Sequence, residues 1–419
     1  MTSKPVLGSE DPHARWLDDP VHQRWLARDA MAQFAFFRRC LRPEPGFDLL
    51  DLRGNPIPGA LQELHSTSRM VHSFALGQLV GFSGAEEIVD HGMDYLWSHH
   101  RDGTHGGYIW SLDYNGIADG TKLAYGHVFV LLAGASAKLA GHPDADRLIA
   151  DATEVLDRHF WDEGRGLFRD EFNRDWTPFS TYRGMNANMH GIEALLTAFE
   201  ATRESVYRDW AGRILEFFVG QIAPLFGWRL PEHYTEDWQV DPEHDGNPMF
   251  RPGGTTPGHS FEFARLLLQY WDLRSRPDDG SPDRARRLFE TALSDARDTE
   301  RGGFVYTVNF DGSWRKPVRY WWPVTEAIGA VAAFMKLDWC AEDERIYRDL
   351  WHFSSEMLID HENGGWFPEI DEANRPVARQ FTGKPDIYHS VQAALFPRST
   401  AMSHIGRNLA GRSPLFSSI

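Results

Sequence analysis

Cysteine is scarce in this sequence: its 419 residues include only Cys40 and Cys340. Two cysteines are too few for a zinc cluster and can form at most one disulfide bridge. Both lie in stretches whose apolar residues have helical spacing, so we expect two reduced cysteines in the hydrophobic core. Neither a zinc cluster nor a disulfide framework is therefore predicted.

Long apolar runs and basic charge are also lacking. No stretch approaches the roughly 18 apolar residues of a membrane-spanning helix, and residues 1–16 have no apolar run behind a basic start. The 43 Lys and Arg are outnumbered by 60 Asp and Glu, which gives a formal net charge of −17. Nucleic acids and anionic membranes bind basic surfaces, so neither is expected as a partner. We expect a cytoplasmic protein.

Apolar residues with helical spacing, by contrast, fill most of the chain. They make up 42% of the sequence, with 16 Trp and 27 Phe, which suffices for a large core. The spacing predicts twelve helices, at residues 21–41, 66–82, 85–100, 119–140, 144–161, 185–202, 204–222, 257–275, 281–297, 322–340, 342–360 and 388–410. The sequence therefore predicts an all-α protein.

Glycine-rich markers recur between the predicted helices. They lie at residues 106–107, 164–166, 302–303 and 364–365; the first two and the last two of these markers are about sixty residues apart. Each marker leads into a short alternating aromatic run typical of a β-hairpin, such as residues 304–310. Six helical hairpins can close into an (α/α)6 barrel, whereas an open array would need polar caps at both ends. We expect one barrel domain over residues 1–419, with short β-hairpins over one mouth.

In such a barrel every second helix is an inner one, and the first turns of the inner helices meet at one mouth. The predicted inner helices carry these polar or titratable groups near their starts: Arg69, His127, Asn186, His190, His259, Glu262, Trp322, Glu326 and His389. Gathering such groups at one end of a packed ring is costly unless they serve a ligand or one another. Taken singly, His127 could be a satisfied core residue, and Arg69 could pair with Glu262.

The start at Pro257 is the most informative of the six. Gly253 and Gly254 end any preceding regular structure, and proline suits a first helical turn because its missing N–H would have no partner there. His259 and Glu262 then lie three residues apart in the first turns. A helix N-terminus carries partial positive charge, which disfavours imidazolium, so a histidine there can act as an acid or base near pH 7.

Several longer motifs carry a family resemblance. They are Arg69-Met70, YRGMNANMH at 182–190, GGTTPGHSFE at 253–262, WPVTEA at 322–327 and KPDIYH at 384–389. With these motifs the chain resembles the N-acylglucosamine 2-epimerase superfamily of (α/α)6 barrels, and within it the aldose–ketose isomerases of mannose or sulfoquinovose. The resemblance implies a sugar isomerase without cofactor or metal. Such an enzyme would convert D-mannose to D-fructose, or D-lyxose to D-xylulose, through an enediol intermediate.

The resemblance also implies roles for single residues. His389 would carry the proton between C1 and C2, His259 would open the sugar ring, and Glu262 would orient His259. Arg69 would steady the enediolate oxygen. The expected substrate contacts are Asn186, His190, Trp322, Glu326 and Asp386. Where the sulfosugar isomerases have two glutamines that hold the sulfonate, this chain has Pro368 and Pro385, which favours a neutral hexose because proline side chains donate no hydrogen bonds.

Other functions remain open on the sequence alone. The pairs His190/Glu193 and His259/Glu262 have the i, i+3 spacing of di-metal helical proteins, which favours a metalloenzyme as one rival. Glycosidases and lyases share the barrel, but glycoside cleavage needs a carboxylate pair, and the convergent groups here are chiefly histidines. A non-catalytic scaffold would not need such groups. A sugar 2-epimerase or a sulfoquinovose isomerase is the alternative within the family, as a monomer or small homo-oligomer.

Overall fold

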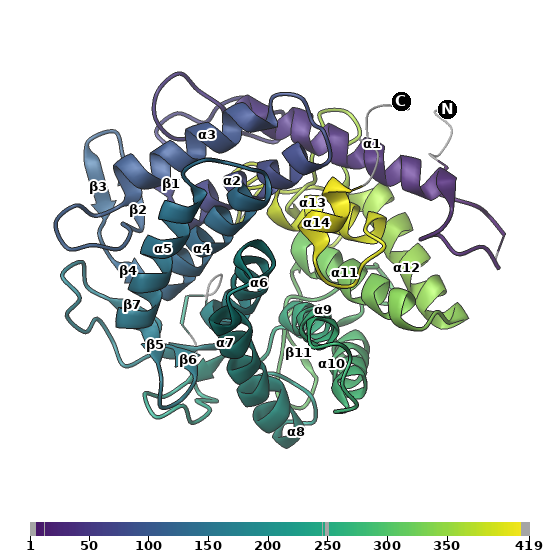
Figure 1. The fold of residues 1–419 in the computed structure, drawn as a ribbon. Coiled ribbons are helices and arrows are strands. Elements are labelled where there is room, and N and C mark those ends of the chain that lie inside the picture. The colour runs from purple at the N-terminus through teal and green to yellow at the C-terminus, as the bar shows by residue number, and fades with distance from the viewer. Residues whose placement is uncertain (1–5, 12, 245, 248–250, 412–419) are drawn as a thin grey trace.

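The computed structural model describes residues 6–11, 13–244, 246–247 and 251–411, and its helices form two concentric rings (Figure 1). The inner helices are α2 (Leu64–Leu79), α4 (Ala124–Leu139), α6 (Met185–Thr202), α9 (Pro257–Leu273), α11 (Trp321–Leu337) and α13 (Tyr388–Leu395). The outer helices are α1 (Pro20–Phe37), α3 (Ala85–Tyr95), α5 (Ala145–Val155), α7 (Ser205–Leu215), α10 (Ser281–Ala296) and α12 (Ala341–Phe353).

Contacts between the first and last helices close the barrel. Each inner helix packs on the next one along the chain, α13 packs on α2, and α1 packs on α13. The chain therefore returns to its own beginning, as expected for six helical hairpins that close into a ring. The predicted all-α fold and (α/α)6 barrel are confirmed.

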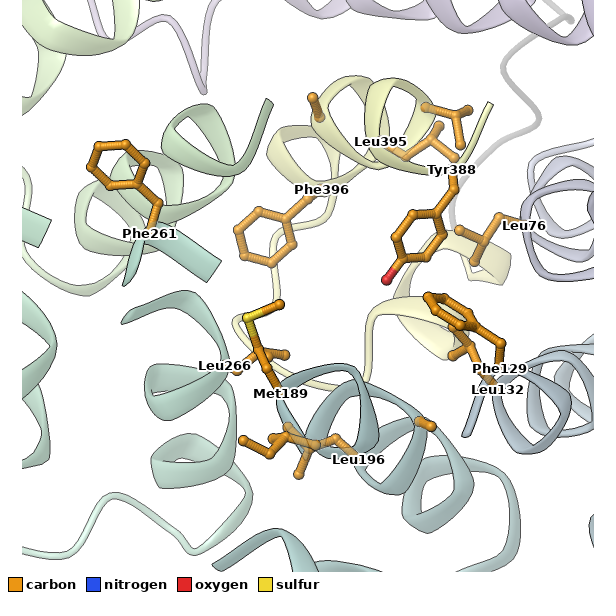
Figure 2. Close-up of a cluster of buried hydrophobic side chains, with 14 of the residues drawn as sticks. Leu76, Phe129, Leu132, Met189, Leu196, Phe261, Leu266, Tyr388, Leu395 and Phe396 are labelled. Carbon is orange, nitrogen blue, oxygen red and sulfur yellow. The ribbon is translucent and has the colours of Figure 1, made fainter. Parts of the chain in front are cut away.

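Burial distinguishes the two rings. Inner helices are covered on all sides, so α11 has no polar side chain between Ala327 and Met335. Outer helices bury one apolar stripe and expose a polar face; in α10, Leu288 and Phe289 are buried while Arg287 and Glu290 are exposed. Figure 2 shows side chains from several inner helices packed together inside the ring, among them Phe129, Met189 and Leu266.

A buried aspartate precedes three of the four recurring glycine markers. Asp102 accepts backbone N–H bonds from Thr104 and His105, and Asp298 and Asp360 do the same for the residues two and three positions after them. The glycine pairs that follow, 106–107, 302–303 and 364–365, all have positive φ, which a side chain would strain. Before these turns, α3 and α12 widen into π-helical turns at residues 96–100 and 354–358.

Short antiparallel strands fix where the inner helices begin. The strands are β1 (Gln62–Glu63), β2 (Ser111–Asp113), β3 (Gly116–Asp119), β4 (Lys122–Leu123), β5 (Trp161–Asp162), β6 (Leu167–Phe168), β7 (Glu171–Phe172), β8 (Arg183–Gly184), β9 (His233–Tyr234), β10 (Thr307–Val308), β11 (Trp314–Lys316), β12 (Arg319–Tyr320) and β13 (Glu369–Ile370). They pair as β1–β2–β3, β4–β7, β5–β6, β8–β9, β10–β11 and β12–β13. Because β1, β4, β8 and β12 run directly into α2, α4, α6 and α11, the starts of these helices are anchored at one mouth.

Two predicted helices differ from the observed ones. The helix predicted at 119–140 begins at Ala124, because residues 116–119 and 122–123 pair as strands instead. The helix predicted at 388–410 breaks after Leu395 into a 3₁₀ turn at Phe396–Arg398 and a separate helix, α14 (Ile405–Ala410). Pro397 lacks the N–H that a continuing α-helix would need.

The two cysteines have different surroundings. Cys40 is buried and free, as predicted. Cys340 is free but exposed, so its predicted place in the core is wrong. It lies at the N-cap of α12, where its Sγ accepts a hydrogen bond from the N–H of Asp343 at 3.5 Å. Within the described part of the chain, no helix is both long and apolar enough to cross a membrane.

The turn at Asp102 provides a stability test. Lys122 Nζ donates to Asp102 Oδ2 at 3.0 Å, and both side chains are at most 1% exposed. We expect Asp102→Ala to lower the free energy of unfolding by about 3–5 kcal/mol, because it leaves a buried ammonium without its carboxylate. Denaturant unfolding followed by circular dichroism measures the change.

The exposed pair Lys138–Asp146 is the matched control. Asp146→Ala should change the free energy of unfolding by less than about 1 kcal/mol, as is usual for a solvated pair. Equal effects of the two substitutions would contradict a structural role for the buried pair.

Candidate active site

A cavity of about 780 Å³ lies at the mouth where the inner helices begin. Eight of the nine predicted site residues line it: Arg69, Asn186, His190, His259, Glu262, Trp322, Asp386 and His389. The ninth, Glu326, lies behind the wall and reaches the cavity through His389. The structure thus brings together side chains that are up to 320 positions apart in the sequence.

His389 is held by a buried carboxylate and a buried guanidinium. Its Nδ1 lies 2.8 Å from Glu326 Oε1, and Arg265 Nη2 donates to Glu326 Oε2 at 3.0 Å. Burial alone would raise the pKa of Glu326, but the charge of Arg265 and the contact with His389 hold it well below its usual range. An ionised Glu326 accepts the Nδ1 proton, which leaves Nε2 of His389 as the nitrogen free for proton transfer.

His259 has a similar partner, which differs from the predicted one. Its Nδ1 lies 2.8 Å from Glu232 Oε1, and the same oxygen accepts the N–H of Thr256 at 3.2 Å. The prediction that Glu262 orients His259 is therefore wrong. Glu232 lies directly before β9, in an extended segment whose residue Pro231 pairs with Thr255, so no helical spacing relates it to His259. The ring of His259 stacks on Trp322 at 5.0 Å.

Glu262 faces a third histidine instead. Its Oε1 lies 3.5 Å from His190 Nδ1, and among the described residues neither of its carboxylate oxygens has a hydrogen-bond partner. Burial and the nearby Glu326 raise the pKa of Glu262 well above its usual value. Burial, with Arg69 next, lowers the pKa of His190 well below its usual value. In this third pair, burial therefore favours the uncharged form of both side chains.

Arg69 is fixed by hydrogen bonds and by aromatic rings. It donates to Asp386 Oδ2 at 2.9 Å and to the Tyr125 hydroxyl at 2.8 Å, so the alternative that Arg69 pairs with Glu262 is wrong. Its guanidinium lies 4.5 Å from the ring of Phe129 and 4.6 Å from that of Tyr388. The contact with Arg69 also makes Asp386 a support for this arginine at the cavity wall.

The two prolines of the sulfosugar comparison lie in different places. Pro385 lines the cavity. Pro368 is not among the described lining residues; it is buried beside α11, where its carbonyl accepts the N–H of Trp321 at 3.2 Å. Of the two, only Pro385 can therefore influence a substrate directly. His127, the other open alternative, is a core residue whose Nε2 accepts the N–H of Tyr108 at 3.0 Å.

Three residues of the metal alternative do come close together. The potential ligand atoms of His190, Glu193 and Glu262 lie within 4.8 Å of one another. Arg265 lies 3.7 Å from Glu193 and 3.8 Å from Glu262, and Tyr388 donates to Glu193. A cation at this point would therefore lie close to the positive charge of Arg265, which disfavours metal binding there.

Comparison with known proteins places this site among sugar isomerases and epimerases. The family model for N-acylglucosamine 2-epimerase (GlcNAc 2-epimerase) matches residues 46–393. The chain is 36% identical to the D-mannose isomerase of Pseudomonas cannabina pv. alisalensis, over 94% of this chain and 97% of that protein. It is 37% identical to the D-mannose isomerase of Thermobifida fusca, over 91% and 95% of the two chains.

Solved structures agree on the architecture. A crystal structure of a D-mannose isomerase matches with a TM-score of 0.83 and 34% identity, over 89% of this chain and 97% of that one. The cellobiose 2-epimerase of Spirochaeta thermophila matches with a TM-score of 0.79 and 24% identity, over 92% and 97%. The second likeness shows the shared fold alone.

The carboxylate behind His259 gives a test of the site geometry. We expect Glu232→Gln to lower kcat by about 10²-fold, the lower end of what a proton-transfer group contributes, because an amide cannot stabilise the imidazolium form of His259. The matched control is Glu236→Gln, since Glu236 is exposed and lies 3.8 Å from Arg183. Steady-state kinetics of both folded variants measure the effect. A wild-type kcat for Glu232→Gln would contradict a role for the His259–Glu232 contact.

Proposed function

The chain belongs to the N-acylglucosamine 2-epimerase family, and from that premise we propose that it is an aldose–ketose isomerase which converts D-mannose to D-fructose. The observation that carries the proposal is the pair of histidines next to Trp322, each with a glutamate on its Nδ1. The ring centroids of His259 and His389 lie 5.0 and 5.8 Å from that of Trp322. The similarity to D-mannose isomerases supports this substrate.

The reaction needs two kinds of proton transfer. The ring must first open, which moves a proton from the anomeric hydroxyl to the ring oxygen. In the open chain the C2–H bond then breaks and a C1–H bond forms, while the proton of the C2 hydroxyl passes to the C1 oxygen. The intermediate is an enediol, and no electron acceptor is required because C1 is reduced as C2 is oxidised. An acid or base with a pKa near neutrality suits each transfer.

The two histidines divide these steps. His389 takes the proton from C2 and returns it to C1 with its Nε2, because its Nδ1 is occupied by Glu326. His259 serves ring opening and the oxygen protons, and Glu232 stabilises its imidazolium form. Both lie in the first turns of inner helices, at the same mouth of the barrel.

Arg69 and the aromatic wall complete the site. Arg69 stabilises the negative charge that develops on the enediolate oxygen, and Asp386 keeps its guanidinium in position. Trp322 offers a flat apolar face to the sugar, while Asn186 and His190 contact its hydroxyl groups. Asp386 balances the charge of Arg69, which favours a neutral sugar over an anionic one.

The proposal also covers the domain organisation, the location and the oligomeric state of the protein. The barrel acts as one catalytic domain over residues 1–419, although residues 1–5 and 412–419 lie outside the described ones. It works in the cytoplasm as a monomer or small homo-oligomer. The absence of a membrane-crossing helix from the described residues and the net charge of −17 are compatible with that location.

Replacement of each histidine tests the assignment of the proton transfers. We expect His259→Ala and His389→Ala each to lower kcat by about 10²–10⁴-fold, since each removes a proton-transfer group. His99→Ala is the control, because His99 is exposed on the π turn after α3. Turnover at the wild-type rate in either of the first two variants, with a native circular dichroism spectrum, would refute the assignment.

Substrate comparison tests the proposed activity itself. We expect kcat/KM for D-mannose to exceed that for sulfoquinovose and for N-acetylmannosamine. D-lyxose should rank second, because it has the configuration of D-mannose at C2, C3 and C4. A preference for sulfoquinovose or for the N-acetyl sugar would move the chain to another branch of the family. Pro385→Gln should raise the activity on sulfoquinovose, because it adds an amide donor at the cavity wall.

A further inference from the structure

The buried arginine Arg265 lies behind the residues that line the mouth cavity. Arg265 of α9 is 5% exposed and faces carboxylates from three inner helices. Its Nη2 donates to Glu326 of α11 at 3.0 Å and lies 3.8 Å from Glu262 of α9, and its Nη1 lies 3.7 Å from Glu193 of α6. A single guanidinium group therefore lies within 4 Å of three buried carboxyl groups.

Two of these carboxyl groups contact a side chain that lines the mouth cavity, and the third contacts Tyr388, whose ring lies against Arg69. Glu326 holds His389, Glu262 lies against His190, and Glu193 accepts the hydroxyl of Tyr388. Arg265 itself is not among the residues that line the mouth cavity. It lines a smaller cavity of about 80 Å³, which lies toward the opposite ends of the inner helices. Arg265 therefore acts on the reaction through its neighbours and does not touch the sugar.

A glycine in the adjacent helix makes room for this arginine. A Cβ at position 329 of α11 would lie 3.0 Å from Cδ and 3.3 Å from Nε of Arg265, closer than side chains normally approach. Glycine in the middle of a helix is destabilising relative to alanine. Gly329 thus weakens α11 locally, and the space that the Arg265 side chain needs explains why glycine is present there.

Arg265 lowers the pKa of both Glu262 and Glu326, and it donates a hydrogen bond to Glu326 alone of the two. Burial raises the pKa of both Glu262 and Glu326, but Arg265 contacts Glu326 directly and brings its pKa below the usual value. Glu262 keeps a raised pKa, because the ionised Glu326 lies nearby. The other titratable and charged groups around Arg265 are Arg69 and His72 of α2, His190 of α6, and Tyr388 and His389 of α13.

These neighbours do not supply a second cation for Glu326. Burial lowers the pKa of His72 to about 3 and that of His190 well below its usual value, and Arg265 contributes to both shifts. Burial raises the pKa of Tyr388 well above its usual value, so its hydroxyl keeps its proton. Arg69 is bound to Asp386. The low pKa of Glu326 therefore depends on Arg265 and on the hydrogen bond with His389.

We propose that Arg265 is a positioning residue for the isomerisation: it holds Glu326 ionised and in place, so that Glu326 can orient His389 for the transfer between C2 and C1. The inference rests on the proposed function for the identity of the reaction. It extends the catalytic unit by one residue that has no contact with the substrate.

The first test replaces the cation. Arg265→Met should lower kcat by about 10²-fold, because His389 loses its fixed orientation, while KM changes by less than threefold. Removing a positive charge favours protonation of the coupled Glu326–His389 pair, so the acid limb of kcat/KM should move to higher pH. Arg265→Lys keeps the charge and should restore the position of the limb in part. The control is Arg286→Met on α10, which breaks the bidentate contact with Asp343 at 2.7 Å far from the site.

The second test leaves the charge in place. Gly329→Ala should displace the Arg265 side chain by a few tenths of an ångström and lower kcat several-fold. Its melting temperature should stay the same or rise, since alanine favours helix over glycine. This variant also covers the case in which Arg265→Met does not fold. A wild-type kcat and acid limb in Gly329→Ala, or in a folded Arg265→Met, would overturn the inference.

A measurement without substrate separates this inference from the proposed function. In the free protein with ¹³C-labelled histidine, the ring of His389 can be identified from the signal lost in His389→Ala. Its titration midpoint should move to higher pH in Arg265→Met. An unchanged midpoint would overturn the role of Arg265 even if the wild type isomerises D-mannose. A shifted midpoint in a protein inactive on D-mannose would support Arg265 and contradict only the proposed substrate.

Discussion

The hydrogen bond between a histidine Nδ1 and a buried glutamate is the interaction on which the rest of the site depends. It occurs at His259 with Glu232 and at His389 with Glu326, in both cases at 2.8 Å. A histidine on a helix start could otherwise rotate and present either nitrogen. The carboxylate fixes the tautomer and the ring, and it stabilises the positive charge that the ring acquires when it takes a proton. Burying two such carboxylates is costly, which explains why Arg265 lies beneath one of them.

The barrel provides the geometry that these contacts need. Because α13 packs against α2, the inner helices form a closed ring and their starts face a common cavity. Short strands and the turns at Asp102, Asp298 and Asp360 hold the loops that lead into those starts. Side chains from distant parts of the chain can thus approach within hydrogen-bonding distance, while the helices that carry them pack side by side in the ring (Figure 1).

Periodicity made much of this structure predictable from the sequence. Helical spacing and the recurring glycines gave the ring, and the polar groups at every second helix start gave Arg69, His190, His259 and His389 as cavity residues. Periodicity could not give Glu232, which lies 27 positions before His259 in an extended segment whose place depends on strand pairing.

Residues inside or beyond a regular pattern were also missed. Arg265 interrupts an apolar run of α9, so its carboxylate partners on other helices were not visible in the local spacing. The same limit applies to Cys340, where a helical pattern hid an exposed N-cap, and to the break after Leu395, where the apolar spacing continued past the end of the helix.

The central claim is that the two histidine–glutamate pairs move a proton from C2 to C1 of D-mannose through an enediol. Incubation with D-mannose in heavy water, followed by NMR, tests it most directly. The account predicts D-fructose with deuterium at C1, since the histidine proton exchanges with solvent; D-glucose as the main product, or D-fructose free of deuterium, would contradict it.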